Sequence, residues 1–260
     1  MRELLRFFVA PESLLGDQVT ISGDVHHHLH NVLRTRLGSV LTLLDGQGLC
    51  CEVELVAISK REAYARVIRR WRDEERTLPI SLVQGMPKAD KFDLILQKGT
   101  ELGMRCFQPV ETDNMVPQIN VARMAKREQR WSRIATEAAR QCRRSFLPEV
   151  RSVQKLTEVI SGETDDLKLV LWEAGPVPLA LALPEETPSG VTLLVGPEGG
   201  FTDQEIKNIS EAGFQAVHLG PRILRTETAG LAATAILQYI YGDWRQAPVN
   251  EELNLHEEKP

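Results

Sequence analysis

The sequence predicts an α/β protein with a small N-terminal β-barrel and a larger C-terminal domain built on a mainly parallel sheet. Three observations predict this fold. Residues 1–72 contain short segments of alternating apolar and polar residues around a glycine-rich turn, which is typical of β-strands. After Pro79, apolar strand-like runs alternate with helix-like segments, the pattern of a parallel sheet. The chain has 260 residues, enough for two domains with cores of their own.

The first domain, residues 1–72, is predicted to be rich in strands. We expect a short helix that runs into a loop at 24–37 and strands at 40–45, 49–57 and 63–69. Asp45-Gly46-Gln47-Gly48 is a turn signal between the first two strands. Three short strands joined in this way indicate a small barrel.

A polar linker at 73–78 precedes the second predicted domain, residues 79–243. The expected strands are 80–85, 106–110, 167–172, 191–195 and 216–219. The expected helices are 90–102, 121–144, 202–213 and 227–241. Asp90 is the expected N-cap of the first helix and Gly103 its C-cap, and Thr202 and Glu205 form a capping box. The acidic tail, 244–260, is expected to be disordered.

Charge is distributed unevenly along the chain. The formal net charge is -5, yet residues 121–144 hold eight Lys and Arg against two Glu. A local basic face matters more for binding phosphates than the global sum. The simpler interpretation is a solvated helix face, and charge alone favours it.

Several classes of protein are excluded by composition. No apolar run approaches the roughly eighteen residues of a membrane span, and the first residues lack the features of a signal peptide. The four cysteines, Cys50, Cys51, Cys106 and Cys142, form neither a disulfide framework nor a Cys-x-x-Cys metal motif. A reducing cytoplasm is the expected location.

The first motif is Gly196-Pro197-Glu198-Gly199-Gly200, which follows an apolar strand. Loops at the carboxyl ends of parallel strands are where α/β sheets bind ligands. Glycines let the backbone approach a ligand closely. The spacing matches neither the dinucleotide fingerprint nor the P-loop. A nucleotide-like ligand is one interpretation, and a tight turn without a ligand is the alternative.

The second motif is Leu219-Gly-Pro-Arg-Ile-Leu-Arg-Thr-Glu-Thr-Ala229. Two arginines flank Ile223 and Leu224 between a short strand and a helix of small residues. Apolar side chains beside backbone polar groups suit an adenine ring, and a nearby arginine suits an anion or a carbonyl. The alternative is a helix N-terminus with exposed arginines.

Together the two motifs resemble the signature loops of SPOUT-class methyltransferases, and most closely the bacterial ribosomal RNA small subunit methyltransferase E family. Enzymes of this family methylate N3 of a uridine in 16S ribosomal RNA. Further similar segments are Arg6-Phe-Phe8, Asn31-Val-Leu-Arg34, Lys98-Gly-Thr-Glu-Leu-Gly103 and Glu137-Ala-Ala-Arg-Gln-Cys-Arg-Arg144. The resemblance extends over residues 1–242 and leaves out the acidic tail.

The resemblance implies a PUA-like barrel followed by an α/β domain with a deep trefoil knot, which pattern alone does not suggest. It implies S-adenosylmethionine as cofactor, no metal, and 16S ribosomal RNA or the small ribosomal subunit as partner. It also implies a homodimer with the active site near the subunit interface. The residues expected to hold the cofactor are Glu173, Leu194, Gly196, Glu198, Gly199, Leu219, Gly220, Ile223, Leu224 and Ala229.

The chemistry that the resemblance implies needs a cation beside the uracil, because N3 becomes nucleophilic only after it loses its proton. Arg225 is the expected catalytic cation and Arg6 the second candidate. The general base is left open, with Glu173 as a weak candidate. The residues expected to bind RNA are Arg6, Arg34, Arg36, Lys88, Lys91, Lys98, Arg140 and Arg143.

Other interpretations stay open or are set aside. His26 and His30 lie four residues apart, but no further ligands complete a metal site. A related SPOUT enzyme that acts on a ribose 2′-hydroxyl or on transfer RNA is the second functional hypothesis. A silent RNA-binding assembly protein is the third.

Overall fold

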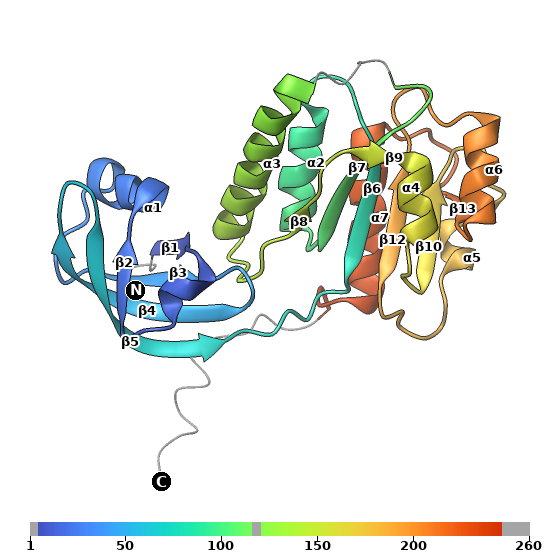
Figure 1. The fold of residues 1–260 in the computed structure, drawn as a ribbon. Helices are drawn as coiled ribbons and strands as arrows, with labels where there is room; N and C mark the ends of the chain where they lie inside the picture. Colours follow the sequence, from blue (N-terminus) through green and yellow to red (C-terminus); the bar gives the residue numbers. More distant parts are fainter. Residues whose placement is uncertain (1–4, 116–120, 246–260) are drawn as a thin grey trace, which may run out of the picture.

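The computed structural model describes residues 5–115 and 121–245, which fold into two sheets with their helices (Figure 1). Most of the predicted acidic tail, residues 246–260, lies outside the described residues. Within the described part of the chain, no helix combines the length and the apolar character needed to cross a membrane.

The N-terminal sheet has five strands in the order β1-β3-β4-β5-β2. They are β1 (Leu5–Phe8), β2 (Gln18–Ile21), β3 (Val40–Leu44), β4 (Leu49–Ile58) and β5 (Ala63–Arg72). β1 runs parallel to β3, and the other neighbours are antiparallel. The three predicted strands are present, but β1 and β2 were missed because four residues give too little alternation.

The expected short helix at 24–37 is α1 (Gly23–His27), which continues as a π-helical turn over His28–Val32. A short 3-10 helix, Pro11–Leu14, separates β1 from β2. The buried face of the sheet forms a core of its own around Phe7, Ile21 and Leu41. β1 and β2 are the two edges of the sheet in the described residues, so closure into a barrel stays a prediction.

The C-terminal sheet has eight strands, all paired in parallel; parallel pairing and five of the strands were predicted, whereas the two-residue strands β8, β9 and β11 were not. The order is β11-β13-β10-β12-β6-β7-β8, and β9 also pairs with β7. The strands are β6 (Ile80–Gly85), β7 (Cys106–Glu111), β8 (Glu149–Val150), β9 (Gln154–Lys155), β10 (Leu167–Leu171), β11 (Val177–Pro178), β12 (Val191–Val195) and β13 (Gln215–His218).

Helices cover both faces of this sheet (Figure 1). They are α2 (Lys91–Glu101), α3 (Val121–Gln141), α4 (Leu156–Gly162), α5 (Leu179–Ala182), α6 (Asp203–Glu211) and α7 (Thr226–Tyr241). Strand β12 shows why a layer of helices is needed on each face. Leu193 packs on one face in the core with α2, α3 and α7, and Leu194 packs on the other face in the core with α4 and α6. A strand buried on both faces reads as a continuous apolar run.

The predicted caps of the helices were partly confirmed. The capping box of α6 is present, with reciprocal hydrogen bonds between Thr202 and Glu205. Gly103 follows α2 with a φ of 88°, the left-handed conformation expected of a C-cap glycine. Asp90 precedes α2 but makes no capping hydrogen bond, and its carboxylate instead lies 3.6 Å from Arg130 on α3. Tertiary pairing thus replaces the local cap.

Candidate functional site

A cavity of about 360 Å³ lies at the carboxyl ends of β10 and β12, beside the N-terminus of α7. This is the edge at which parallel sheets bind ligands. Its lining comprises Lys91, Leu171, Trp172, Glu173, Val195, Gly196, Pro197, Glu198, Gly200, Phe201, Ile223, Leu224, Arg225, Thr226 and Ala229. The two motif loops therefore contribute to one cavity although residues 201–218 lie between them in the sequence.

A smaller cavity of about 60 Å³ adjoins the first and shares the walls formed by Leu171, Trp172 and Leu224. Leu219 and Gly220 line it, together with Arg222. Gly220 has a φ of 98°, so the turn after β13 depends on a residue without a Cβ at this position. The segment 219–229 thus reaches both cavities.

A buried polar network ties the first loop to α7. The Nε2 of Gln84, at the end of β6, donates to the Oγ1 of Thr226 at 2.9 Å. The Thr226 hydroxyl in turn donates to the carbonyl of Gly196 at 2.6 Å. Because an unpaired buried polar group costs about 1–3 kcal/mol, this network fixes the distance between the two loops. Gln84 was not among the predicted site residues, because one glutamine in a strand forms no motif.

Packing between neighbouring strand ends is equally tight. A Cβ placed on Gly85 would lie 2.7 Å from the backbone nitrogen of Pro197, and a Cβ on Gly196 would lie 3.1 Å from the Phe201 ring. Glycine at these two positions lets the loop lie against β6 without displacing the ring.

Charge at the mouth of the cavity centres on Lys91, the first residue of α2. Its Nζ lies 2.9 Å from the Oε1 of Glu198 and 3.2 Å from the Oε2 of Glu227. Glu198 also accepts the backbone N–H of Lys88 at 3.1 Å. Burial raises the pKa of Glu198, but Lys91 and two backbone N–H groups outweigh it, so the net pKa is lowered. The hydrogen bond from Lys91 to Glu198 raises the pKa of Lys91. Both groups are therefore charged at neutral pH.

Arg225 occupies the N-cap position of α7 at the rim of the cavity, and its side chain is 81% exposed. Its Nη1 lies 3.9 Å from the Oε1 of Glu227, at the outer limit of an ion pair. The guanidinium is therefore held loosely on the side that faces solvent.

Three expected site residues lie elsewhere. Leu194 is fully buried in the core with α4 and α6, on the sheet face behind the strand, so its side chain does not line the cavity, and its expected contact with the cofactor stays a prediction. Gly199 lies against Asn114 rather than in the lining of the cavity. Arg6 lies at the junction of the two sheets and donates to Ser145 at 3.0 Å, so within one chain it does not join Arg225. Similarity to a family motif identifies residues by their position in the sequence, and it does not show on which face of a strand each side chain lies.

The residues expected to bind RNA have different surroundings. Arg34, Arg36, Lys88 and Arg143 are exposed, and Arg34 and Arg143 have positive φ angles of 50° and 65°. Non-glycine residues seldom adopt this conformation. Lys91, Lys98 and Arg140 form ion pairs with neighbouring carboxylates.

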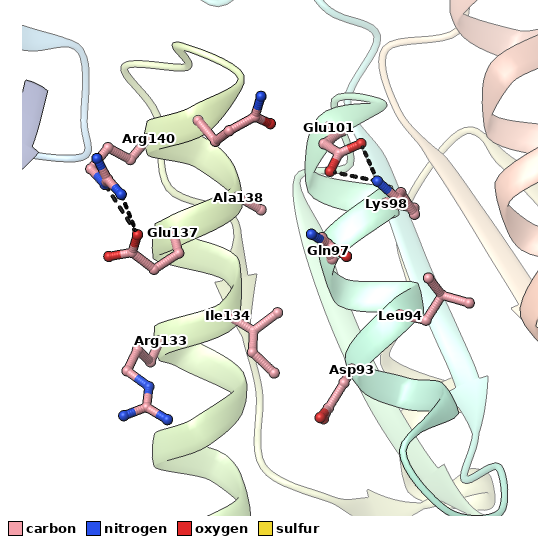
Figure 2. Close-up of a pocket in the computed structure, with 11 residues that line it drawn as sticks. Asp93, Leu94, Gln97, Lys98, Glu101, Arg133, Ile134, Glu137, Ala138 and Arg140 are labelled. Carbon is pink, nitrogen blue, oxygen red and sulfur yellow. Dashed lines mark hydrogen bonds and ion pairs between the residues drawn. The ribbon is translucent and has the colours of Figure 1, made fainter.

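Lys98 and Arg140 line a groove of about 660 Å³ between α2 and α3. Figure 2 shows their pairs with Glu101 and Glu137 on the two helices. The groove is lined by three cationic and three carboxylate side chains, namely Lys98, Arg133, Arg140, Asp93, Glu101 and Glu137. Its charge is balanced, so it is not a basic channel for RNA.

The histidine cluster has structural contacts. His26 is buried, its Nε2 lies 2.9 Å from the carbonyl oxygen of Ser59, and its ring stacks on His30. Within residues 5–115 and 121–245, no three His, Cys, Asp or Glu side chains gather in a way that could hold a metal ion.

Comparison with known proteins gives matches to both halves of the chain. Residues 74–238 match the family model of the RNA methyltransferase domain, and residues 21–68 match that of the RNA methyltransferase PUA domain. Ribosomal RNA small subunit methyltransferase E of Bacillus subtilis (strain 168) is 36% identical over 85% of this chain and 89% of its own. The protein of the same name from Synechocystis is 34% identical over 88% of this chain and 76% of its own.

Solved structures agree over nearly the whole chain. Ribosomal RNA small subunit methyltransferase E from Neisseria gonorrhoeae, bound to S-adenosylmethionine, superposes with a TM-score of 0.84 at 35% identity. The alignment covers 93% of this chain and 100% of that one. A Legionella pneumophila methyltransferase in complex with the same cofactor gives a TM-score of 0.85 at 33% identity, over 93% of this chain and 99% of that one.

The polar network predicts a stability defect when the Thr226 hydroxyl is removed. Thr226→Val leaves the Gly196 carbonyl and the Gln84 amide without this partner, so we expect a loss of about 1–3 kcal/mol in the free energy of unfolding. Urea denaturation measures it. Thr228→Val, an exposed position in the same turn, is the matched control and should change stability by less than about 0.5 kcal/mol. Equal losses for the two variants would contradict the role of the network.

Proposed function

Since the chain belongs to the ribosomal RNA small subunit methyltransferase E family, we propose that it transfers the methyl group of S-adenosylmethionine to N3 of a uridine in 16S ribosomal RNA. The observation that carries the proposal is the cavity to which residues 196–200 and 219–229 both contribute, at the carboxyl ends of β10 and β12. The relative from Neisseria gonorrhoeae, which aligns over 93% of the chain, was solved with this cofactor bound.

The residues at the cavity fit S-adenosylmethionine. Ligand cavities are commonly about 300–1,000 Å³ and mostly apolar with a few polar groups, and this one measures about 360 Å³. Leu171, Ile223 and Leu224 offer apolar surface for an adenine ring. The carboxylates of Glu173 and Glu198 offer negative charge near a sulfonium. The remaining proposed contacts are Gly196, Leu219, Gly220 and Ala229, with Gly199 in the same loop.

The bound cofactor supplies an activated methyl group on a sulfonium. The chain has to hold a uridine with N3 in line with that methyl and to stabilise the negative charge that appears on the uracil as N3 loses its proton. We assign the second task to Arg225, because its guanidinium lies at the rim of the cavity and is only weakly held by Glu227. N3 is hidden in a base pair, so the uridine has to be unpaired or flipped out.

This role of Arg225 predicts a defect in turnover rather than in cofactor binding. Arg225→Ala should lower kcat by about a hundredfold or more, the usual cost of losing one charge-stabilising group, and should leave the Kd for S-adenosylmethionine within about threefold. Transfer of a tritiated methyl group to small ribosomal subunits from a strain that lacks the modification measures kcat, and calorimetry measures Kd.

The control for this variant is Arg151→Ala, at an exposed arginine that follows the edge strand β8 and does not line the cavity. Its kcat should stay close to that of the wild type. Turnover by Arg225→Ala at the wild-type rate would refute the assignment.

Exposed cations of both domains are proposed to contact RNA phosphates. Arg34, Arg36, Lys88 and Arg143 are the exposed members of the predicted set, and the PUA match at residues 21–68 includes the first two. Each phosphate contact releases counterions, so binding to RNA should weaken steeply as salt rises. A ribosomal RNA substrate also implies a cytoplasmic location.

We also propose that the protein is a homodimer joined through an apolar face of α5 and α7. Leu181, Ile236 and Tyr239 are 77%, 41% and 58% exposed, and Ile236 lines a cavity of about 320 Å³ whose other walls come from α5, the turn after β13 and Ile240 of α7. Clustered exposed apolar side chains on a soluble domain mark interaction sites.

The deep trefoil knot is proposed as well. It is supported by the return of the chain from β13 to α7, which packs on β12 and α2.

The proposed dimer face predicts that a charge at its centre separates the subunits. Ile236→Glu should shift the mass measured by light scattering from that of a dimer to that of a monomer of 29.2 kDa, because it buries an unpaired carboxylate in the interface. Ile68→Glu introduces the same charge at an exposed isoleucine of β5 and should stay dimeric. A dimer that persists in Ile236→Glu would rule out this face.

A further inference from the structure

Lys91 is the one cation that bridges carboxylates from both cavity loops in the described part of the chain. We propose that Lys91 is a positioning residue, which holds Glu227 and so keeps the Arg225 guanidinium free to face the substrate. The inference rests on the proposed role of Arg225. It concerns a residue on α2 that belongs to neither of the two motif loops.

The Glu227 carboxylate lies between two cations. Its side chain is only 13% exposed, its Oε2 is 3.2 Å from Lys91 Nζ, and its Oε1 is 3.9 Å from Arg225 Nη1. The energy of an ion pair varies inversely with separation, so Lys91 holds the carboxylate more tightly than Arg225 does. Lys91 is thus the nearer charge partner of the carboxylate, whose Oε2 makes no hydrogen bond among the described residues, and Arg225 is only loosely attracted.

Removing Lys91 would reverse this balance. A mostly buried carboxylate needs a partner, because burial of an unpaired charge is costly. Among the described residues, the ion pairs of Glu227 are with Lys91 and Arg225. Arg225 would therefore close the gap to Glu227 and withdraw from the rim of the cavity.

Glu198 depends less on Lys91. Both of its carboxylate oxygens also accept the backbone N–H of Lys88, at 3.1 and 3.2 Å. Two contacts to a fixed backbone group keep the loop in place when the lysine is lost. We therefore expect loss of Lys91 to reach the reaction mainly through Glu227 and Arg225.

The position of Lys91 in α2 points the same way. It is the first residue of the helix, where the helix dipole favours acidic side chains and disfavours a lysine. The ion pairs of Lys91 with the carboxylates of Glu198 and Glu227 offset this cost. The lysine at position 91 is therefore explained by its ion pairs with Glu198 and Glu227 and not by a preference for the start of a helix.

The test is a suppressor experiment on the full-length chain, with kcat measured on small ribosomal subunits and the Kd for S-adenosylmethionine measured by calorimetry. Lys91→Met should lower kcat on the order of tenfold or more while Kd changes by less than about threefold. Adding Glu227→Gln to Lys91→Met should restore most of kcat, because the amide no longer draws Arg225 away. Lys91→Arg, which keeps the charge, should retain turnover.

Lys207→Met is the matched control, because Lys207 on α6 pairs with Glu211 at 3.9 Å on the surface and does not line the cavity. Thermal unfolding of each variant checks the fold. Lys91→Gln replaces Lys91→Met if the methionine variant is unstable, with the same expected result.

Two results would overturn the inference. One is a Lys91→Met, Glu227→Gln double variant that is as slow as Lys91→Met. The other is a Lys91→Met variant that loses cofactor affinity at an unchanged kcat. Normal turnover by Arg225→Ala would overturn the role of Arg225 together with this inference. A slow Arg225→Ala beside a normal Lys91→Met would overturn this inference alone.

Discussion

The in-register pairing of parallel strands is the constraint on which the site depends. Val217, Leu171, Val195 and Gln84 are neighbours in one row across β13, β10, β12 and β6. In each strand this residue lies at or next to the last position. Since parallel strands end at the same edge, the loops that follow them emerge side by side. The cavity is the space that these loops enclose.

Polar groups then fix how the loops face one another. The buried amide of Gln84 and the hydroxyl of Thr226 join the end of β6, the loop after β12 and the start of α7. Lys91 adds a second connection at the mouth of the cavity through Glu198 and Glu227. The first connection is buried and holds the geometry, whereas the second is partly exposed and sets the distribution of charge around Arg225.

The features that sequence could predict are those encoded locally. The capping box of α6, the apolar runs of β6 and β12 and the turn between β3 and β4 each depend on a few adjacent residues. What it missed depends on distant contacts. The cap expected from Asp90 was lost to Arg130, and Arg6 turned to Ser145 at the junction of the sheets. Leu194 faces away from the cavity because adjacent residues of a strand alternate between its faces. Lys91, expected on an RNA surface, lies between two carboxylates that sequence places far apart.

Hydrogen exchange of the full-length protein, followed by mass spectrometry with and without S-adenosylmethionine, tests the central claim most directly. Two loops that enclose one ligand should slow their amide exchange together, at 196–200 and at 219–229, when the cofactor is added. Peptides from α4, behind the sheet, should exchange at unchanged rates. Protection confined to one loop, or to neither, would contradict a single cavity built from both.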